Sequence, residues 1–298
     1  MYILEPVMHE TIWGGRGLQK YVGEQAVKLG HLYMVNGHMG MSNKILNGSH
    51  KGRTLHDVFE LQKHDWNMSG FEEFPLTIAL VNASENLSIQ VHPDDSLAER
   101  LENKRIGKTE SWFFLEAPVD GWIYDGCRCN SKKEVMVAVS QGRMEEITDR
   151  KIIRSNDYVC IEAGTLHAMT RGSMVYEIEY GSDFTYRFYD YGRKDEKGKE
   201  RQLHVDKAIQ AIRLENIPRV RRNMGNDWIT EQNYEIRRIT GIKQYRNDGN
   251  ELECLSLICG SGSCQGYEIN PGISIILLPG ERIENIDLRE VMVARLTR

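Results

Sequence analysis

The sequence predicts a mainly β fold, a sandwich or barrel of short strands with a few inserted helices. Three observations predict this class. Short apolar and aromatic runs recur along the chain, turns rich in Gly, Asn and Asp separate them, and only three stretches show helical spacing. Many short strands at such intervals are typical of sandwiches and barrels.

Each expected strand is a run of β-branched, aromatic or other apolar residues between turn signals. The expected strands cover residues 87–92, 111–115, 122–124, 158–161, 174–178, 253–259, 273–278 and 291–296.

Three stretches predict helices. Residues 95–104 are polar, with apolar residues at helical spacing. Ser131 and Glu134 form a capping-box pattern before an apolar run, so one or two helices are expected up to about Ile147. Residues 203–214 place Ala208, Ile212 and their neighbours on one side.

The domain organisation follows from length and from one charged segment. A chain of 298 residues suggests one large or two ordinary domains. Residues 215–227 are charged and contain Pro218 and Gly225, which favours a boundary there. We therefore expect a catalytic domain over 1–214 and a smaller all-β domain over 215–298.

Composition excludes several classes of protein. Lys plus Arg is 38 and Asp plus Glu is 43, a net charge of −5, which argues against general nucleic-acid binding. The longest unbroken apolar run, 135–139, is far short of a membrane span. The charged residues Glu5 and Glu10 argue against a signal peptide. Six cysteines without a CxxC pair indicate reduced thiols in a cytoplasmic protein.

Three separate segments carry residues that suit a metal ion. Gln90 and His92 point to the same side of an expected strand. Glu110 enters the hydrophobic strand that follows it, and His167 follows a tight turn. Two imidazoles, a carboxylate and an amide oxygen suit a divalent ion of the zinc type, although iron would accept the same set. The separations of 18 residues (92 to 110) and 57 residues (110 to 167) match no short metal motif.

A fourth segment, 176–187, adds acid–base and anion-binding candidates. Glu177 and Glu179 share one face of an expected strand, and Asp183 and Arg187 follow near its end. The segment is interpreted as an acid–base and anion-binding edge beside the metal.

Taken together, these residues resemble the type I phosphomannose isomerases, a family of zinc-dependent cupins that interconvert mannose 6-phosphate and fructose 6-phosphate. The matching stretches occur in family order over the first two thirds of the chain; they are Trp13-Gly14-Gly15, 87–95, Gly107-Lys108-Thr109-Glu110, 163–168, Ser182-Asp183, Tyr186-Arg187 and Tyr189-Asp190. The resemblance implies a double-stranded β-helix (cupin, or jelly-roll) barrel and a second, smaller β-barrel domain.

The resemblance also implies roles for particular residues. The family's metal ligands fall on Gln90, His92, Glu110 and His167, which implies one Zn²⁺ per chain. Its catalytic arginine falls on Arg187. Family positions that line the sugar pocket fall on Lys108, Glu177 and Asp183. We further expect Trp13 and Arg16 to contact a sugar-phosphate substrate.

The chain departs from the family pattern at four places. Gly30-His31-Leu32-Tyr33 stands where the family usually has Gly-Glu-x-Trp, and Ala79 stands where it usually has a lysine. Glu162 replaces a proline, and Glu179-Tyr180-Gly181 replaces Gln-Gln-Asn.

The sequence allows more than one residue as the general base and more than one activity for the protein. Glu177 leads as the base, because a poorly solvated carboxylate has a raised pKa. Lys108 is its rival, and His31 and His38 are weaker candidates. Besides the isomerase, the residues allow a non-catalytic phosphosugar-binding paralogue or another metal-dependent cupin enzyme, such as an iron oxygenase. The chain is expected to be a monomer or homodimer, with no nucleic-acid or membrane partner.

Overall fold

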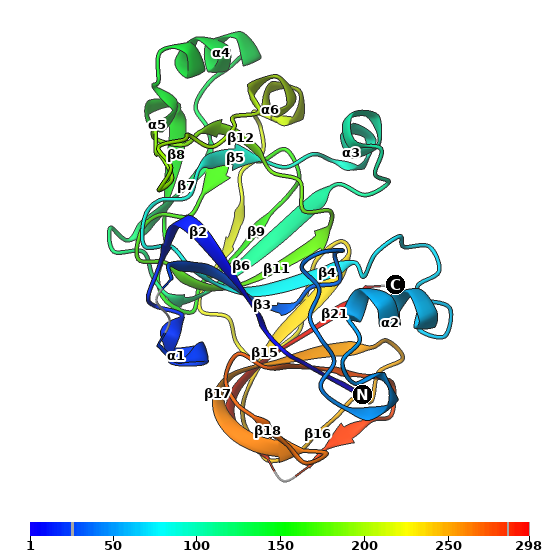
Figure 1. The fold of residues 1–298 in the computed structure, drawn as a ribbon. Helices are drawn as coiled ribbons and strands as arrows, with labels where there is room; N and C mark the ends of the chain where they lie inside the picture. Colours follow the sequence, from blue (N-terminus) through cyan, green and yellow to red (C-terminus); the bar gives the residue numbers. More distant parts are fainter. Residues whose placement is uncertain (25–26, 285, 298) are drawn as a thin grey trace.

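The computed structural model describes residues 1–24, 27–284 and 286–297, and most of its regular structure is β-strand (Figure 1). The mainly β prediction is confirmed. The helices are α1 (Gln19–Val22), α2 (Leu55–Gln62), α3 (Asp95–Glu102), α4 (Lys132–Ser140), α5 (Met144–Ile147) and α6 (Val205–Ala211), with a 3₁₀ turn η1 (Gly48–His50).

A seven-stranded antiparallel sheet forms the centre of the molecule. In spatial order its strands are β13 (Arg219–Arg221), β9 (Tyr158–Ile161), β6 (Lys108–Glu116), β11 (Met174–Gly181), β4 (Leu76–Asn82), β3 (Leu29–Val35) and β2 (Val7–Gly15). Both faces of this sheet are covered, which explains why every residue of β4 is buried.

A five-stranded antiparallel sheet faces the inner side of the central sheet (Figure 1). Its strands are β12 (Tyr186–Tyr189), β5 (Ile89–Val91), β10 (His167–Ala168), β7 (Trp122–Cys127) and β8 (Thr148–Ile152). Apolar side chains of both sheets, among them Val81, Phe114, Ile123 and Met169, form one buried cluster between them. Helices α4, α5 and α6 cover the outer face of the smaller sheet.

The C-terminal strands form a further layer, which packs on the outer face of the central sheet through a large shared cluster. Its seven-stranded sheet consists of β1 (Tyr2–Leu4), β19 (Ser274–Leu277), β17 (Glu253–Cys264), β21 (Ile286–Leu296), β15 (Tyr234–Ile242) and β14 (Ile229–Thr230), with β18 (Tyr267–Ile269) paired to β17. Strands β16 (Tyr245–Arg246) and β20 (Arg282–Ile283) form a separate pair. Apart from β13, the described strands after residue 214 therefore belong to these two sheets.

Pairings cross the expected boundary at residue 214 in both directions. The N-terminal strand β1 pairs with β19 of the C-terminal sheet. Strand β13, which follows the boundary, pairs with β9 of the central sheet. The division into 1–214 and 215–298 stays a prediction.

The expected helices are present, and one further helix has a sequence signal of its own. Ser131 caps α4 by accepting a hydrogen bond from the Glu134 backbone N–H. Helix α2 begins at a capping box in which Thr54 and Asp57 satisfy each other's backbone N–H groups. No described helix has both the length and the apolar character needed to cross a bilayer. All six cysteines are unpaired.

Candidate metal centre and substrate site

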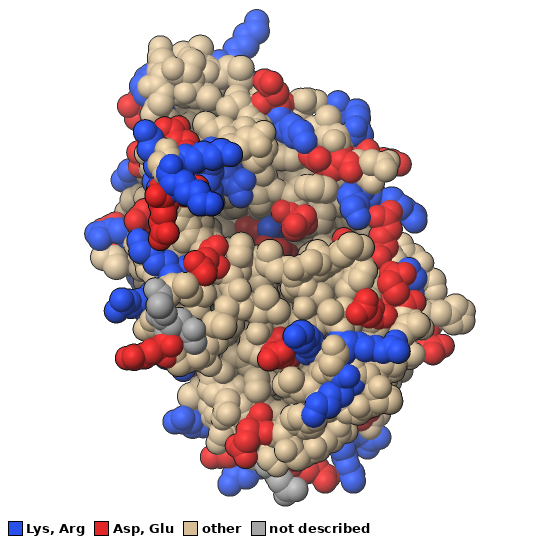
Figure 2. Space-filling view, viewed as in Figure 1, with Lys and Arg blue, Asp and Glu red and all other residues tan. Residues whose placement is uncertain are grey.

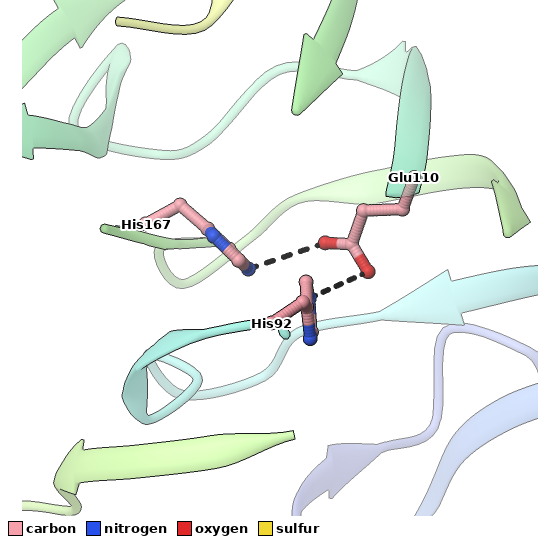
Figure 3. Close-up of side chains that lie close together, drawn as sticks. All are labelled: His92, Glu110 and His167. Atoms are coloured by element: carbon pink, nitrogen blue, oxygen red, sulfur yellow. Dashed lines mark ion pairs between the residues drawn. The ribbon is translucent and has the colours of Figure 1, made fainter. Parts of the chain in front are cut away.

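Three candidate metal ligands meet between the two facing sheets (Figure 3). His92 directly follows β5, Glu110 is the third residue of β6 and His167 begins β10. The His92 Nε2 atom lies 3.1 Å from Glu110 Oε2, and the His167 Nε2 atom lies 3.2 Å from Glu110 Oε1. All three side chains are almost fully buried. The sheets thus bring together residues that are 18 and 57 positions apart in the chain.

The hydrogen bond that each ring makes through Nδ1 indicates which ring nitrogen carries a proton. His92 Nδ1 lies 2.9 Å from the Phe184 carbonyl oxygen, and His167 Nδ1 lies 2.8 Å from the Thr165 carbonyl oxygen. A carbonyl only accepts, so each Nδ1 carries the proton and donates it. In a neutral ring, Nε2 then presents a lone pair to Glu110. Burial lowers the pKa of His92 to about 4, which keeps this ring neutral.

The group therefore fits a divalent metal ion. The Nε2 lone pair of His92 faces one carboxylate oxygen at 3.1 Å, and His167 Nε2 lies 3.2 Å from the other. A lone pair that faces a carboxylate is repelled unless a cation lies between them. His92 Nε2 and Glu110 Oε1 have no hydrogen-bond partner among the described residues. Backbone carbonyls that orient ligand histidines are a common feature of metal sites.

Gln90, the fourth expected ligand, lies beside this group. It pairs with His167 across β5 and β10, which places the two side chains on the same face. Its amide nitrogen lies 3.4 Å from His167 Nε2, while its oxygen accepts a hydrogen bond from Ser88 Oγ at 2.8 Å. Rotation of the amide by half a turn would present the oxygen to the metal group. Ligation by Gln90 stays a prediction.

A buried lysine and two further carboxylates adjoin Glu110. The carboxylates of Glu110, Glu177 and Glu179 lie within 4.8 Å of one another. Lys108 Nζ lies 3.1 Å from Glu110 Oε2 and 2.5 Å from Glu179 Oε1. Burial alone would lower the pKa of Lys108, but the three carboxylates raise it above its ordinary value. Burial would likewise raise the pKa of Glu110, yet the positive charge of Lys108 holds it well below its ordinary value.

Glu177 differs from its neighbours in its surroundings. Its Oε1 accepts a hydrogen bond from Trp112 Nε1 at 2.8 Å. Burial, reinforced by Glu179 and Glu110, raises the pKa of Glu177 well above its ordinary value. A carboxyl group in this state can hold a proton near neutral pH and release it when a nearby group changes.

Aromatic rings line the same interior next to these charges. His31 stacks on Tyr33, with ring centroids 5.2 Å apart, and Trp13 contacts His31 edge to face at 5.0 Å. Burial lowers the pKa of His31 to about 3, so this ring is neutral. Tyr33 pairs with Ala79, and Ala79 pairs with Glu177, on adjacent strands. Trp13 is buried in the apolar cluster between the two sheets, and its contact with a substrate stays a prediction.

Arg187 reaches the site from the smaller sheet. Arg187 pairs with Gln90. Its neighbours Tyr186 and Phe188 belong to the apolar cluster on the outer face of the five-stranded sheet. Because side chains alternate along a strand, the Arg187 side chain is on the inner face of this sheet. Its Nε has no hydrogen-bond partner among the described residues. Arg193 and Arg201 lie nearby in the chain, and both form ion pairs with Asp190.

Two expected substrate contacts lie at the surface. Asp183 is exposed in the turn after β11 and lines a small cavity with Phe71, Ile106 and Phe184. Arg16 is exposed after β2. Figure 2 shows a hollow near the middle of the view that contains charged side chains of both signs. A group of basic side chains lies near its rim.

The sequence interpretation missed Trp112 as a member of the site. Trp112 lies two residues after Glu110 on β6, so period-two alternation could have identified it. Glu179, which was expected on the same face as Glu177, lies two residues after it on β11. His38, a weaker candidate for the base, instead pairs with Glu73 at 3.0 Å.

Comparisons with known proteins agree with this geometry. Residues 1–109 match the family model described as phosphomannose isomerase type I, catalytic domain. The mannose-6-phosphate isomerase ManA of Bacillus subtilis (strain 168) is 34% identical over 215 residues, 72% of this chain and 68% of that protein. The mannose-6-phosphate isomerase of Streptococcus mutans serotype c is 31% identical over 213 residues, 71% of this chain and 67% of that protein.

Solved structures extend the similarity to the whole chain. The crystal structure of the mannose 6-phosphate isomerase from Bacillus subtilis has a TM-score of 0.85 and 27% identity, over 98% of both chains. A mutant of the phosphomannose isomerase from Salmonella typhimurium, 13% identical, matches over 100% of both chains with a TM-score of 0.73, which shows a shared fold.

Proposed function

This chain belongs to the type I phosphomannose isomerase family, and from that premise we propose that it is a zinc-dependent isomerase that interconverts mannose 6-phosphate and fructose 6-phosphate through a cis-enediol. The two facing sheets are the cupin fold of this family. The observation that carries the proposal is the convergence of two histidine Nε2 atoms on Glu110, beside a lysine and a second acid.

One zinc ion per chain would be held by His92, Glu110 and His167, with Gln90 as a weaker fourth ligand. A zinc ion in this group supplies Lewis-acid chemistry, which stabilises the negative charge that builds on the sugar oxygens. It has no redox chemistry, which suits a reaction without net oxidation. Two nitrogen donors and one carboxylate oxygen suit zinc or iron, and the resemblance to a zinc-dependent family favours zinc.

Glu177 is the proposed base. Conversion of the aldose moves the carbon-bound proton from C2 to C1, and the hydroxyl proton of O2 passes to O1. In its ionised form Glu177 would take the proton from C2 and then, as the carboxylic acid, return it to C1. A raised pKa makes that carboxylate a stronger base. Lys108 lies close to the same carboxylates, and its ammonium group would donate a hydrogen bond to a sugar oxygen.

Arg187 is proposed to bind negative charge on the substrate. Its guanidinium stays charged at working pH and offers a rigid fork to the enediolate or the phosphate. Trp13 would pack against the sugar, while Asp183 and Arg16 would act from the rim. A chain with a net charge of −5 thus needs locally positive groups to attract a dianionic substrate.

The departures from the family pattern at positions 31 and 79 are the observation that favours the alternative, a phosphosugar-binding paralogue without turnover. Tyr33 pairs with Ala79 and His31 pairs with Val81, so positions 31 and 79 are diagonal neighbours on one face. Ala79 supplies no positive charge there for a substrate phosphate.

The test measures metal content alongside isomerisation of mannose 6-phosphate. We expect about one zinc per chain and turnover that is lost with a chelator and restored by zinc. Substrate binding without turnover would instead favour a non-catalytic paralogue. Iron content with oxygen consumption would favour an oxygenase.

A further inference from the structure

Lys108 is held between two carboxylates that differ in their other contacts. Its ammonium contacts Glu110 Oε2 at 3.1 Å and Glu179 Oε1 at 2.5 Å, and only 6% of its side chain is exposed. Glu110 and Glu179 are paired residues on β6 and β11, so both carboxylates lie on the inner face of the central sheet. Two of the three N–H donors of Lys108 are thereby engaged, and one remains for another acceptor.

Glu110 cannot remain a full ion-pair partner of Lys108 when a metal ion is bound to the group of His92, Glu110 and His167. The Oε2 atom that contacts Lys108 also lies 3.1 Å from His92 Nε2, on the side where the metal group converges. A divalent ion held there would draw on the charge of the same carboxylate. It would also repel the lysine ammonium, because the two are like charges in a buried site.

Glu179 is the carboxylate that can remain the ion-pair partner of Lys108 when a metal ion is bound. It contacts Lys108 but does not contact either metal-binding histidine in the described structure. Glu177 is engaged by Trp112 Nε1. On β4, Thr77 pairs with Glu179 and Ala79 pairs with Glu177, so neither paired residue brings a second ammonium group to these carboxylates.

We infer that Glu179 is a positioning residue that holds the Lys108 ammonium beside the loaded metal group. Without it, Lys108 would depend on Glu110 alone and would compete with the metal for that carboxylate. The inference rests on the metal site of the proposed function, and it concerns metal binding directly, whatever the substrate.

A double-mutant cycle on zinc affinity tests it, with Zn²⁺ affinity measured by competition with a chelator. Glu179→Gln, which keeps the shape and removes the charge, is expected to weaken zinc binding at least about tenfold, because one partner of a buried charge is lost. In a Lys108→Met background the same substitution is expected to change zinc affinity by less than about threefold. Glu179→Asp, which keeps the charge, is expected to restore most of the affinity.

The matched control is Glu116→Gln. Glu116 lies on the same strand as Lys108 and pairs with Lys20 at 2.7 Å, but both side chains are about half exposed. Its loss should leave zinc affinity unchanged. Three results would overturn the inference. Glu179→Gln could leave zinc affinity unchanged, or could lower it equally with Lys108 and with Lys108→Met. The third is an equal loss of zinc affinity in Glu179→Gln and Glu179→Asp. Because zinc binding is measured without turnover, a failure of isomerisation would overturn the proposed function alone.

Discussion

At the scale of single residues, the ring nitrogens that face away from Glu110 determine the chemistry of the metal group. Two backbone carbonyls, those of Phe184 and Thr165, fix the proton of each imidazole on Nδ1. The carbonyls belong to loops outside the ligand positions themselves. Ligand geometry is therefore a property of the folded backbone around each histidine.

Replacement of His167 by Ala is expected to abolish zinc binding and turnover together, because it removes one of two nitrogen donors from a three-residue group. Bound zinc is measured by elemental analysis after dialysis and turnover by a coupled assay. His64→Ala, at a histidine that is 94% exposed, is the control and should change neither. Full turnover of His167→Ala without metal would contradict the zinc assignment.

Replacement of Arg187 by Ala is expected to retain zinc and to lower kcat/KM at least about 10²-fold, the size of effect seen when one charge-stabilising donor is removed. Arg187 pairs with Gln90 and is not one of the three residues of the metal group. Zinc content and kinetics are measured on the same preparation. Arg246→Ala, at an exposed arginine, is the control. Unchanged kinetics would remove Arg187 from the chemistry.

Asp125 gives a pH prediction. It pairs with His167 on the inner face, is fully buried, and neither carboxylate oxygen has a hydrogen-bond partner among the described residues. Burial raises its pKa to about 7. Because Asp125 ionises at a lower pH in the unfolded chain than in the folded protein, the folded state loses stability as the pH rises. The loss occurs between the ordinary pKa of an aspartate and a pH of about 7.

Asp125→Asn should therefore raise Tm by a few degrees at pH 8, with a much smaller effect at pH 4. Thermal unfolding is followed with a chelator present, because a cation near His167 would oppose the rise in pKa. Asp120→Asn, at an exposed carboxylate, should show no such difference between the two pH values. An equal change in Tm for Asp125→Asn at both values would contradict the assignment.

At the scale of elements, helix α2 shows how a local signal determines where a helix starts. The Thr54 side chain accepts a hydrogen bond from the Asp57 backbone N–H, and Asp57 accepts one from the Thr54 backbone N–H at 3.3 Å. Leu55, Val58 and Phe59 of the helix are buried. The helix is thus held by its cap and by its apolar side together.

Thr54→Ala is expected to destabilise the protein by about 1 kcal/mol, the usual cost of a lost N-cap, and to leave zinc content unchanged. Chemical denaturation measures the free energy of unfolding. Thr54→Ser keeps the hydroxyl oxygen and is the control, with a loss well below that of Ala. Equal losses in both variants would show that the cap hydrogen bond contributes little.

At the scale of the whole molecule, the central sheet needs a cover on both faces. Its outer face shares a buried cluster with the C-terminal layer, in which Leu80, Phe113 and Tyr176 lie with Ile236 and Met292. A buried hydrogen bond also joins Tyr176 to Ser256 across this boundary. The two parts of the chain are therefore one structural unit in terms of packing.

A chain that ends at residue 214 is expected not to fold as a soluble monomer. The truncation would expose the outer face of the central sheet and would leave β1 without its partner β19. Circular dichroism and size-exclusion chromatography check this, with the full chain as control. A monomeric, cooperatively unfolding fragment would support the division at residue 214 as a boundary between independent domains.

Much of the fold and part of the site could be predicted from local patterns. The run 174–178 showed a strand, and the matching stretches around His92, Glu110 and His167 indicated the metal group. The position of Asp125 and the contact of Glu179 with Lys108 could not be predicted in this way, because both depend on which strands are neighbours. Lys108 was weighed as a base, whereas the structure surrounds it with carboxylates that raise its pKa.

The sequence by itself determined the strand-rich class, most helix positions and the set of metal-binding residue types, because these depend on side-chain periodicity and on chemistry within short segments. Only the tertiary structure decided that His92, Glu110 and His167 converge, that Lys108 lies between two carboxylates and that β1 joins the C-terminal sheet. These features depend on long-range strand pairing and on burial. Burial shifts pKa values through desolvation, which no residue experiences until the sheets have closed around it.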